Sequence, residues 1–490
     1  MSDADVLDVL ASFSRARVLV FGDVMLDRFV YGSVGRTSPE APVPVMRLER
    51  TSNLPGGAAN VAANVAALGA SVRLLGVVGE DAAAQELRAQ LSATALLQAQ
   101  LVLDPSRPTT TKTRYVADQQ QVLRTDVELT SPVSDAVAEA LIARFTASLA
   151  DADIIILSDY GKGVFSDEVT ARAIQAASAA GKRVLVDPKS RSFLKYRGAS
   201  ILTPNKDELQ RACGHDCPGD EQVVDAARAI LAQDICETLV VTRGREGMSV
   251  VTRHGETLHI RTVATEVYDV TGAGDTAVAA MAVALACGAQ IAAAMRLANV
   301  AAGIVVGKHG TATASPEEIL ARLGNLPEPA TPESRHTLER AQRLVARWRR
   351  LGLSVAFTNG CFDVLHPGHV SLLNQAKAAA DRLVVGLNSD ASVRRLKGAN
   401  RPVQNAAARA LVLSSLKAVD AVVIFEDDTP LALIRALEPD VLVKGADYTV
   451  QTVVGADLVL ARGGKVVLAD LVPAHSTSET IRRIVSIARA

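Results

Sequence analysis

Two glycine-containing stretches, far apart in the chain, hold residues that could handle phosphate. The first is DVTGAGDTAVAAM, residues 269–281. Gly272 and Gly274 allow a tight turn before a helix, whose free N–H groups and positive dipole end attract a phosphoryl group. The backbone from Gly272 through Ala273 to Gly274 would then hold the transferring phosphate. Asp275, at the helix start, could accept a proton from a substrate hydroxyl. The stretch therefore predicts phosphoryl transfer.

Two other interpretations of this stretch are weaker. Gly272, Gly274 and Ala277 fit the dinucleotide-binding pattern G-x-G-x-x-A. That pattern follows the first strand of its unit and meets an acidic residue about 20 positions later, at the end of the next strand. Here the helix is followed by another helix. A plain helix cap would explain Asp275 or the glycines singly, but less easily all of them together.

The second stretch is FTNGCFDVLHPGHV, residues 357–370. It predicts a buried strand, a glycine turn at Asn359 and Gly360, and a helix that opens with His366 and His369 on one face. Two histidines at this spacing could ligate a metal, although the third ligand of a zinc site is not apparent. Taken alone, they are explained more simply as helix-capping residues.

Alternating strands and helices must position these residues. Short β-branched runs alternate with amphipathic stretches from residue 17 onward, which is typical of a parallel sheet covered by helices on both faces. We expect strands at 17–23, 153–159, 183–188 and 237–244, and helices at 56–69, 166–181 and 273–288. Residues 41–52 and 109–118 break the rhythm and look like paired strands that form a lid outside the main sheet.

A proline-rich segment divides the chain. Three prolines at 327, 329 and 332, among glutamates, threonine and serine, indicate an exposed linker. We therefore expect domains at 1–320 and 337–490, with a linker at 321–336. The basic amphipathic stretch 337–352 fits a helix that caps the second domain better than one that lies on a membrane surface. A second series of βα units follows it.

The first domain resembles the ribokinase (PfkB-type) family of sugar kinases. The shared motifs, besides residues 269–281, are GDVMLDRF, PGGAANVAANVAALG, NKDE and VTRGREG. The resemblance implies an α/β ribokinase-like fold with a β lid, Mg²⁺ organised by Glu208, and K⁺ as a further candidate ion. It implies that sugar hydroxyls are bound by Asp23, Asp27, Gly56, Gly57 and Asn60. It implies that ATP is bound by Asn205, Glu208, Thr242, Gly244, Gly247 and Asn299.

The second domain resembles the HxGH nucleotidyltransferase superfamily, which implies a smaller Rossmann-like fold. His366, His369 and the helix amino end would stabilise charge as the α-phosphate of a nucleotide is attacked and pyrophosphate departs, with Lys377 in the same catalytic group. The resemblance implies nucleotide contacts from Asn359, Gly360, Asp390, Lys397, Arg409, Ser476, Thr477 and Ser478. It implies sugar phosphate contacts from Lys444 and Asp447. Cys361 is expected to be a small packing residue.

The order of motifs along the whole chain resembles the bifunctional heptose kinase/adenylyltransferase family of lipopolysaccharide assembly. This implies ATP-dependent phosphorylation of D-glycero-β-D-manno-heptose 7-phosphate at O1 and adenylyl transfer to heptose 1-phosphate, with a separate phosphatase acting between the steps. We expect the 7-phosphate to meet a group of cationic side chains, namely Lys112, Arg114, Arg124, Lys162 and Lys189. The alternatives are a kinase/cytidylyltransferase for another sugar or polyol phosphate and a non-catalytic sugar sensor. The resemblance also implies a homodimer, because lid strands of the sugar kinase family often pair between subunits, here near residues 41–52 and 109–118.

Composition sets the remaining limits. A net charge of −1 over 490 residues gives no reason to expect nucleic acid or an anionic membrane as a partner. No apolar run reaches the ~18 residues of a membrane span, and the amino terminus is acidic. Five cysteines without a regular framework indicate a reducing compartment, so we expect a cytoplasmic enzyme. CGHDC, residues 213–217, is interpreted as a polar loop, because no second Cys/His pair completes a zinc site.

Overall fold

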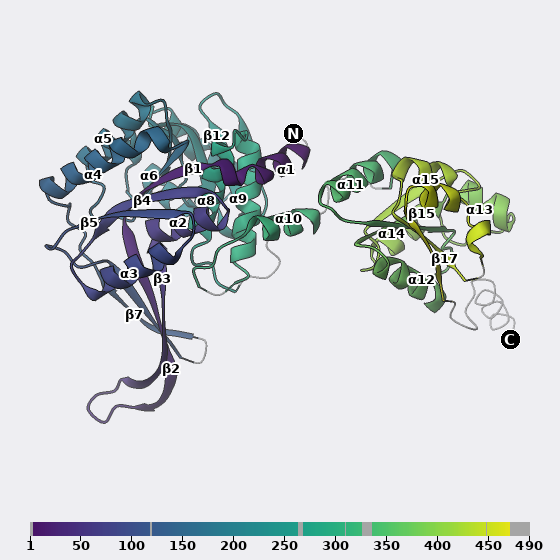
Figure 1. Cartoon of the computed structure of the whole chain (residues 1–490), viewed down its shortest axis with the longest axis horizontal. Helices are drawn as coiled ribbons and strands as arrows, with labels where there is room; N and C mark the ends of the chain where they lie inside the picture. Colours follow the sequence, from purple (N-terminus) through teal and green to yellow (C-terminus); the bar gives the residue numbers. More distant parts are fainter. Residues whose placement is uncertain are drawn as a thin grey trace. The chain divides into compact units, whose positions relative to one another are not determined.

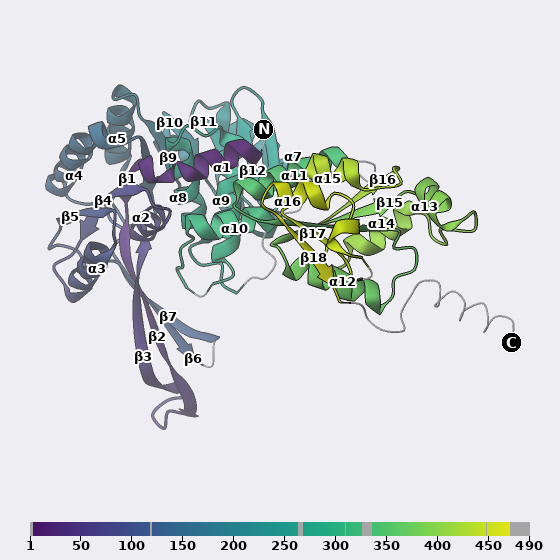
Figure 2. The ribbon, with the colours of Figure 1, turned by 45° about the vertical axis from the view of Figure 1, so that its right-hand side comes forward.

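The computed structural model describes residues 3–117, 120–262, 268–308, 310–325, 336–446 and 448–470. It separates into two units, Met1–Leu323 and Gly324–Ala490. Both units are α/β, and Figures 1 and 2 show the helices and strands of each. No helix of the described residues is both long and apolar enough to cross a bilayer.

The main sheet of the first unit is built from the apolar runs that the sequence marks as strands. Its order is β13-β12-β11-β10-β9-β8-β1-β4-β5. The strands are β1 (Arg17–Gly22), β4 (Ser71–Val78), β5 (Leu97–Leu103), β8 (Ile154–Ser158), β9 (Arg183–Asp187), β10 (Ala199–Leu202), β11 (Cys236–Thr242), β12 (Met248–Thr252) and β13 (Thr257–Ile260). The strands from β5 to β11 are parallel, and β12 and β13 add an antiparallel edge that the alternation of strands and helices did not predict.

Helices cover both faces of this sheet. A large apolar core joins one face to α4 (Asp135–Ser148), α5 (Asp167–Ala179) and α7 (Asp220–Leu231). On the other face, α2 (Ala58–Ala67) and α8 (Ala273–Ala286) contact β1. The remaining helices are α1 (Asp3–Ala11), α3 (Ala82–Ala93), α6 (Lys206–Cys213), α9 (Ile291–Val305) and α10 (Pro316–Asn325). The last five residues of α10, 321–325, lie in the segment predicted as linker.

A separate four-stranded sheet forms the lid, and Figure 1 shows its long strands projecting from the body of the first unit. Its order is β3-β2-β6-β7, formed by β2 (Val24–Thr37), β3 (Pro44–Gly57), β6 (Thr111–Ala117) and β7 (Gln120–Val127). The two predicted lid segments belong to this sheet. They do not pair with each other, because β3 and β6 lie on opposite sides of β2.

The second unit contains a parallel five-stranded sheet with the order β16-β15-β14-β17-β18. Its strands are β14 (Val355–Gly360), β15 (Arg382–Asn388), β16 (Ala421–Phe425), β17 (Val441–Gly445) and β18 (Lys465–Ala469). One core packs the sheet against α11 (Leu338–Arg350), α15 (Leu431–Leu437) and α16 (Ala456–Ala461). A second core packs it against α12 (Pro367–Ala378) and α14 (Ala406–Ser414), and α13 (Asp390–Lys397) follows β15.

Candidate active sites

The carboxylate of Asp275 is buried at the start of α8. Gly272 precedes the helix with a φ of 79°, which glycine adopts without strain and which lets the loop turn into the helix. The side-chain amide of Asn60 donates to Asp275 Oδ2 at 2.6 Å, and the Tyr160 hydroxyl donates to Oδ1 at 2.5 Å. Burial raises the pKa of Asp275 to about 6, although both hydrogen bonds lower it. A carboxylate of this kind suits a general base near neutral pH.

A cavity of about 1100 Å³ opens in front of Asp275. The loop Gly272–Ala273–Gly274 forms part of its wall. Asp27, Gly57, Lys112 and Arg114 line it from the lid side, while Asn205, Glu208, Thr242, Gly244, Gly247 and Asn299 line it elsewhere. The structure therefore brings the predicted sugar-side and ATP-side residues to one cavity, with Asp275 in its wall.

The NKDE motif forms a capping box at the start of α6. The Asn205 side chain accepts from the backbone N–H of Glu208 at 2.8 Å, and Glu208 accepts from the backbone N–H of Asn205 at 2.9 Å. The second carboxylate oxygen of Glu208 pairs with Lys189 at 3.0 Å. The motif thus fixes Glu208 at the cavity wall.

Asp187 is a cavity residue that sequence reasoning missed. It is the last residue of β9, and burial together with the charges of Asp275 and Glu208 raises its pKa well above the usual value. Acidic residues crowded in this way favour a bound cation, and oxygen ligands suit Mg²⁺. The only advance signal was an aspartate at the end of a strand in VLVDP.

Three predicted sugar contacts have other roles in the structure. Asp23 is buried and accepts hydrogen bonds from the backbone N–H groups of Tyr160, Lys162 and Val164, so it fixes that loop and does not line the cavity. Asn60 holds Asp275, as described above. Gly56 packs against the Asp27 side chain so closely that any Cβ would collide with it.

The five predicted 7-phosphate cations separate into two groups. Lys112, Arg114 and Lys189 line the cavity. Arg114 also pairs with Asp27 at 2.5 Å, and burial lowers the pKa of Lys112. Lys162 pairs with Glu128 at 2.7 Å, and Arg124 pairs with Asp126 on the exposed strand β7. Neither of these two is among the residues that line the cavity.

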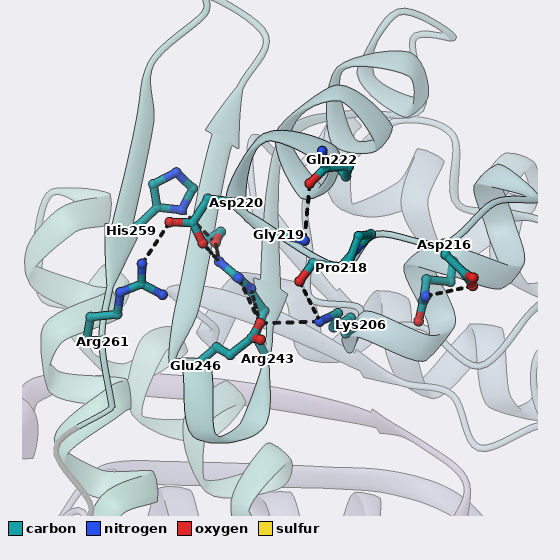
Figure 3. A network of polar contacts seen from close by, with 12 residues as sticks. Lys206, Asp216, Pro218, Gly219, Asp220, Gln222, Arg243, Glu246, His259 and Arg261 are labelled. Carbon is teal, nitrogen blue, oxygen red and sulfur yellow. Dashed lines mark hydrogen bonds and ion pairs between the residues drawn. The ribbon is translucent and has the colours of Figure 1, made fainter.

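A network of charged side chains supports the loop that carries Gly244 and Gly247 (Figure 3). Arg243, whose side chain is buried, pairs with Asp220 at 2.6 Å and with Glu246 at 2.7 Å. Lys206 pairs with Glu246, and Arg261 pairs with Asp220. The network joins this loop to the starts of α6 and α7.

In the second unit, the opening of α12 brings the two histidines together. His366 is the N-cap and Pro367 the first helical residue, a position where the missing N–H of proline costs no hydrogen bond. The His366 and His369 rings stack with their centroids 3.8 Å apart. Burial, and then the neighbouring His366, lowers the pKa of His369 to about 4. His369 is therefore neutral at physiological pH.

Lys377 does not join the histidines. It lies in the last turn of α12, eight residues after His369 and thus about 12 Å further along the helix. Its ammonium group pairs with Asp420 at 2.7 Å and donates to the carbonyl of Asp381. Both aspartates directly precede strands, so Lys377 lies at the amino edge of the sheet. The structure gives no support for its assignment to the catalytic group.

The other predicted nucleotide residues have mixed outcomes. Asn359 and Gly360 end β14, and Lys444 on the adjacent β17 donates to the Asn359 carbonyl at 3.1 Å. Arg409 is buried and pairs at 2.6 Å with Asp390, whose side chain is partly exposed. Lys397 is exposed at the end of α13. Asp447, Ser476, Thr477 and Ser478 lie outside the described residues.

Sequence reasoning also missed Asp363, which is buried in the loop before α12. Its carboxylate pairs with Arg401 at 2.5 Å and accepts from the backbone N–H groups of Val403 and Gln404. It therefore ties the histidine loop to the segment before α14. Burial raises the pKa of the neighbouring Cys361 thiol, which agrees with a packing role for that residue.

Comparison with known proteins covers both units. Residues 15–318 match the pfkB family of carbohydrate kinases, and residues 357–481 match the cytidylyltransferase-like family. The chain is 53% identical over 482 residues to the Bifunctional protein HldE of Caulobacter vibrioides, with 97% of this chain and 99% of that protein covered. This chain belongs to the bifunctional HldE family. The family predicted from the sequence is thereby confirmed.

Further HldE relatives agree along the whole length. The HldE proteins of Paramagnetospirillum magneticum and Rhodospirillum rubrum are 52% and 50% identical, with 95% and 97% of this chain and 96% of each relative covered. Full-length identity confirms that the kinase and nucleotidyltransferase units belong to one bifunctional enzyme, and the kinase/cytidylyltransferase alternative is not favoured.

Solved structures confirm the ribokinase-like fold of the first unit. Ribokinase of Arabidopsis thaliana is 21% identical with a TM-score of 0.51, and its match covers 64% of this HldE-family chain and 99% of that protein. Phosphofructokinase-2 of Escherichia coli, solved with substrates and products, is 19% identical with a TM-score of 0.54, covering 62% and 97%. ATP-using families of kinases and of nucleotidyltransferases typically use Mg²⁺.

Proposed function

We propose that this HldE-family chain catalyses two separate steps toward ADP-heptose. The first unit phosphorylates O1 of D-glycero-β-D-manno-heptose 7-phosphate with ATP, giving the 1,7-bisphosphate. After another enzyme removes the 7-phosphate, the second unit transfers AMP from ATP to heptose 1-phosphate and releases pyrophosphate. The observation that carries this proposal is the cavity at Asp275. The predicted ATP-binding residues, the carboxylate of Asp275 and cations that suit a phosphorylated sugar all line it.

In the kinase step, Asp275 takes the proton of the O1 hydroxyl as that oxygen attacks the γ-phosphorus. The bond between the γ-phosphorus and the departing ADP oxygen breaks, while the backbone N–H groups at the start of α8 stabilise the charge on the transferring group. Asn60 and Tyr160 hold the carboxylate in place. We assign the 7-phosphate to Lys112 and Arg114, which line the cavity from the lid side, whereas Lys189 lines it beside Glu208, its partner on the ATP side.

Glu208 and Asp187 are our candidates to hold Mg²⁺ or its bound waters, because both are carboxylates in the cavity wall. The ion would neutralise charge on the ATP phosphates. Potassium is the second ion to test, since the Escherichia coli phosphofructokinase-2 of this fold has been solved in complex with potassium.

In the nucleotidyl step, the phosphate of heptose 1-phosphate attacks the α-phosphorus of ATP, and the bond to pyrophosphate breaks. The amino end of α12 and the N–H groups of His366 and His369 stabilise the added charge. Because His369 is neutral, it acts as a hydrogen-bond donor and not as a positive charge. Lys444, beside Asn359, is our candidate for a phosphate contact.

We also propose a cytoplasmic homodimer. All five cysteines are free thiols, which suits a reducing compartment. The lid exposes several large apolar side chains that a second lid could cover, namely Val43, Leu48, Val122, Leu123 and Val127. Sedimentation of the Leu123→Asp variant beside the unsubstituted protein tests the dimer. If the lids pair, the variant should shift toward monomer.

Mass spectrometry of the products tests the two reactions. With heptose 7-phosphate and ATP, we expect the bisphosphate alone, and addition of a separate phosphatase should give ADP-heptose. A parallel incubation of heptose 1-phosphate with ATP or CTP reports pyrophosphate release. Formation of CDP-heptose in preference to ADP-heptose would refute the adenylyl assignment, and lack of the bisphosphate would refute the kinase assignment.

A further inference from the structure

A cluster of metal-ligating side chains lies at the carboxyl end of α6, apart from both proposed reactions. The helix ends at Cys213, and Gly214 follows with a φ of 81°, a left-handed conformation that reverses the chain. The reversal carries His215 and Cys217 back toward Cys213. One ligand atom from each of the three residues lies within 4.8 Å of the others. The fold thus brings the three possible donors of the CGHDC stretch together.

The sulfur geometry fits a shared tetrahedral ion. Cys213 Sγ and Cys217 Sγ are 3.9 Å apart. Two thiolates that each bind Zn²⁺ at about 2.3 Å in a tetrahedron lie about 3.8 Å from one another, whereas a disulfide requires about 2.05 Å. Both thiols donate toward the same acceptor, the carbonyl oxygen of His215, at 3.3 and 3.7 Å. The two sulfur atoms therefore face one side of the loop.

Packing explains only one of the three residues. Cys217 is fully buried in the core of the first unit, where any small apolar side chain would serve. Cys213 is half-buried and packs only against the margin of that core, and His215 is exposed, so packing does not account for a histidine here. The exposed side of the imidazole leaves room for water. Three protein ligands and a water molecule form a recognised open zinc site.

We propose that Cys213, His215 and Cys217 bind one Zn²⁺ ion, with water as the fourth ligand. Two thiolates and one imidazole select zinc over the harder Mg²⁺, which prefers oxygen ligands. Binding forms two sulfur–zinc bonds and one nitrogen–zinc bond, and the two thiol protons pass to solvent. The ion is distinct from the Mg²⁺ of the kinase cavity, which is assigned to Glu208, near the start of α6, and to Asp187, at the end of β9.

The position of the cluster gives the ion a structural role. It cross-links the end of α6 to the segment that continues through Pro218 and Asp220. Those residues belong to the network of Figure 3, in which Lys206 donates to the Pro218 carbonyl and Arg243 pairs with Asp220. The ion should therefore stabilise the region that supports the nucleotide loop.

Cobalt and zinc binding by the full-length chain test the proposal. Reduced protein, freed of metal with a chelator, should bind one equivalent of Co²⁺ with a thiolate-to-cobalt charge-transfer band that Zn²⁺ abolishes. Zinc should raise the melting temperature of the protein. Cys213→Ser and His215→Ala should lose the bound equivalent and the zinc-dependent rise. The matched controls Cys287→Ser, a half-buried thiol at the end of α8, and His254→Ala, an exposed histidine, should keep both.

Three outcomes would overturn the proposal. One is a cobalt complex without a sulfur band. Another is an undiminished zinc equivalent in Cys213→Ser, which would place the ion elsewhere. The third is a folded, reduced wild-type chain that binds no zinc, as expected if the two thiols only pack together or act as a disulfide pair. His215 is exposed and Cys213 is only half-buried, and unchanged circular dichroism will check that both variants fold.

Discussion

At the scale of single residues, two opposing effects act on the pKa of Asp275. Burial favours its protonated form, and hydrogen bonds from Asn60 and Tyr160 favour the carboxylate. Asp275→Asn keeps the shape but cannot accept a proton, so the kinase kcat should fall by about 10²–10⁴-fold. Adenylyl transfer by the same preparation is the internal control and should be unchanged. An undiminished kinase rate would show that another group is the base.

Tyr160→Phe gives a pH prediction at the same site. The base works only when deprotonated, so kinase kcat/KM should fall as the pH drops through the pKa of Asp275, about 6. The Tyr160 hydrogen bond lowers that pKa, and its removal should move the acid limb of the profile to higher pH. Tyr115→Phe, on the lid strand β6 and outside the residues that line the cavity, should leave the limb in place. An unshifted limb in Tyr160→Phe would contradict this electrostatic role.

The limits of sequence reasoning are clear for these residues. Asp275 could be identified because a glycine turn and a helix start are local features. Tyr160 and Asn60 could not be assigned to it, since they are 115 and 215 positions away and only the fold brings them together. Lys377 shows a related limit. Its place on the histidine helix was visible in the sequence, but its partner Asp420 belongs to another βα unit.

At the scale of elements, the capping box of α6 couples helix stability to the cavity. Asn205→Ala should destabilise the first unit by about 1 kcal/mol and raise the kinase KM for ATP, because Glu208 loses its fixed position. Ser166→Ala removes the N-cap of α5, whose Oγ accepts from Val169 at 3.1 Å, away from the cavity lining. Ser166→Ala should lower the stability by a similar amount and leave the kinase KM for ATP unchanged. Equal KM values for ATP in the two variants would refute the coupling.

The elements themselves were largely predictable from the sequence. β-branched runs and amphipathic stretches gave the parallel strands and their covering helices, because burial of one face or both imposes a regular pattern. The antiparallel β12 and β13 were not predicted, since an edge hairpin interrupts the alternation that the prediction relied on. The lid segments were found as breaks in that alternation, but their shared partner β2 was not, since it begins inside the GDVMLDRF motif.

At the scale of the whole molecule, each unit has its own apolar core. The first core joins the main sheet to α4, α5 and α7, while α11 packs through Leu344, Val345 and Trp348 into a core of the second unit. Among the described residues, neither of these two cores contains a residue of the other unit. Each unit should therefore fold alone.

Splitting the chain tests this independence and the need for a free intermediate. Residues 1–323 and 324–490, expressed separately, should each keep the kcat of their reaction within about twofold. Because a separate phosphatase must act on the released bisphosphate, a direct channel offers no advantage. Equimolar halves mixed with that phosphatase should therefore form ADP-heptose as fast as the intact chain. A slower mixture, with both half-reactions intact, would show that the covalent connection itself contributes to the overall flux.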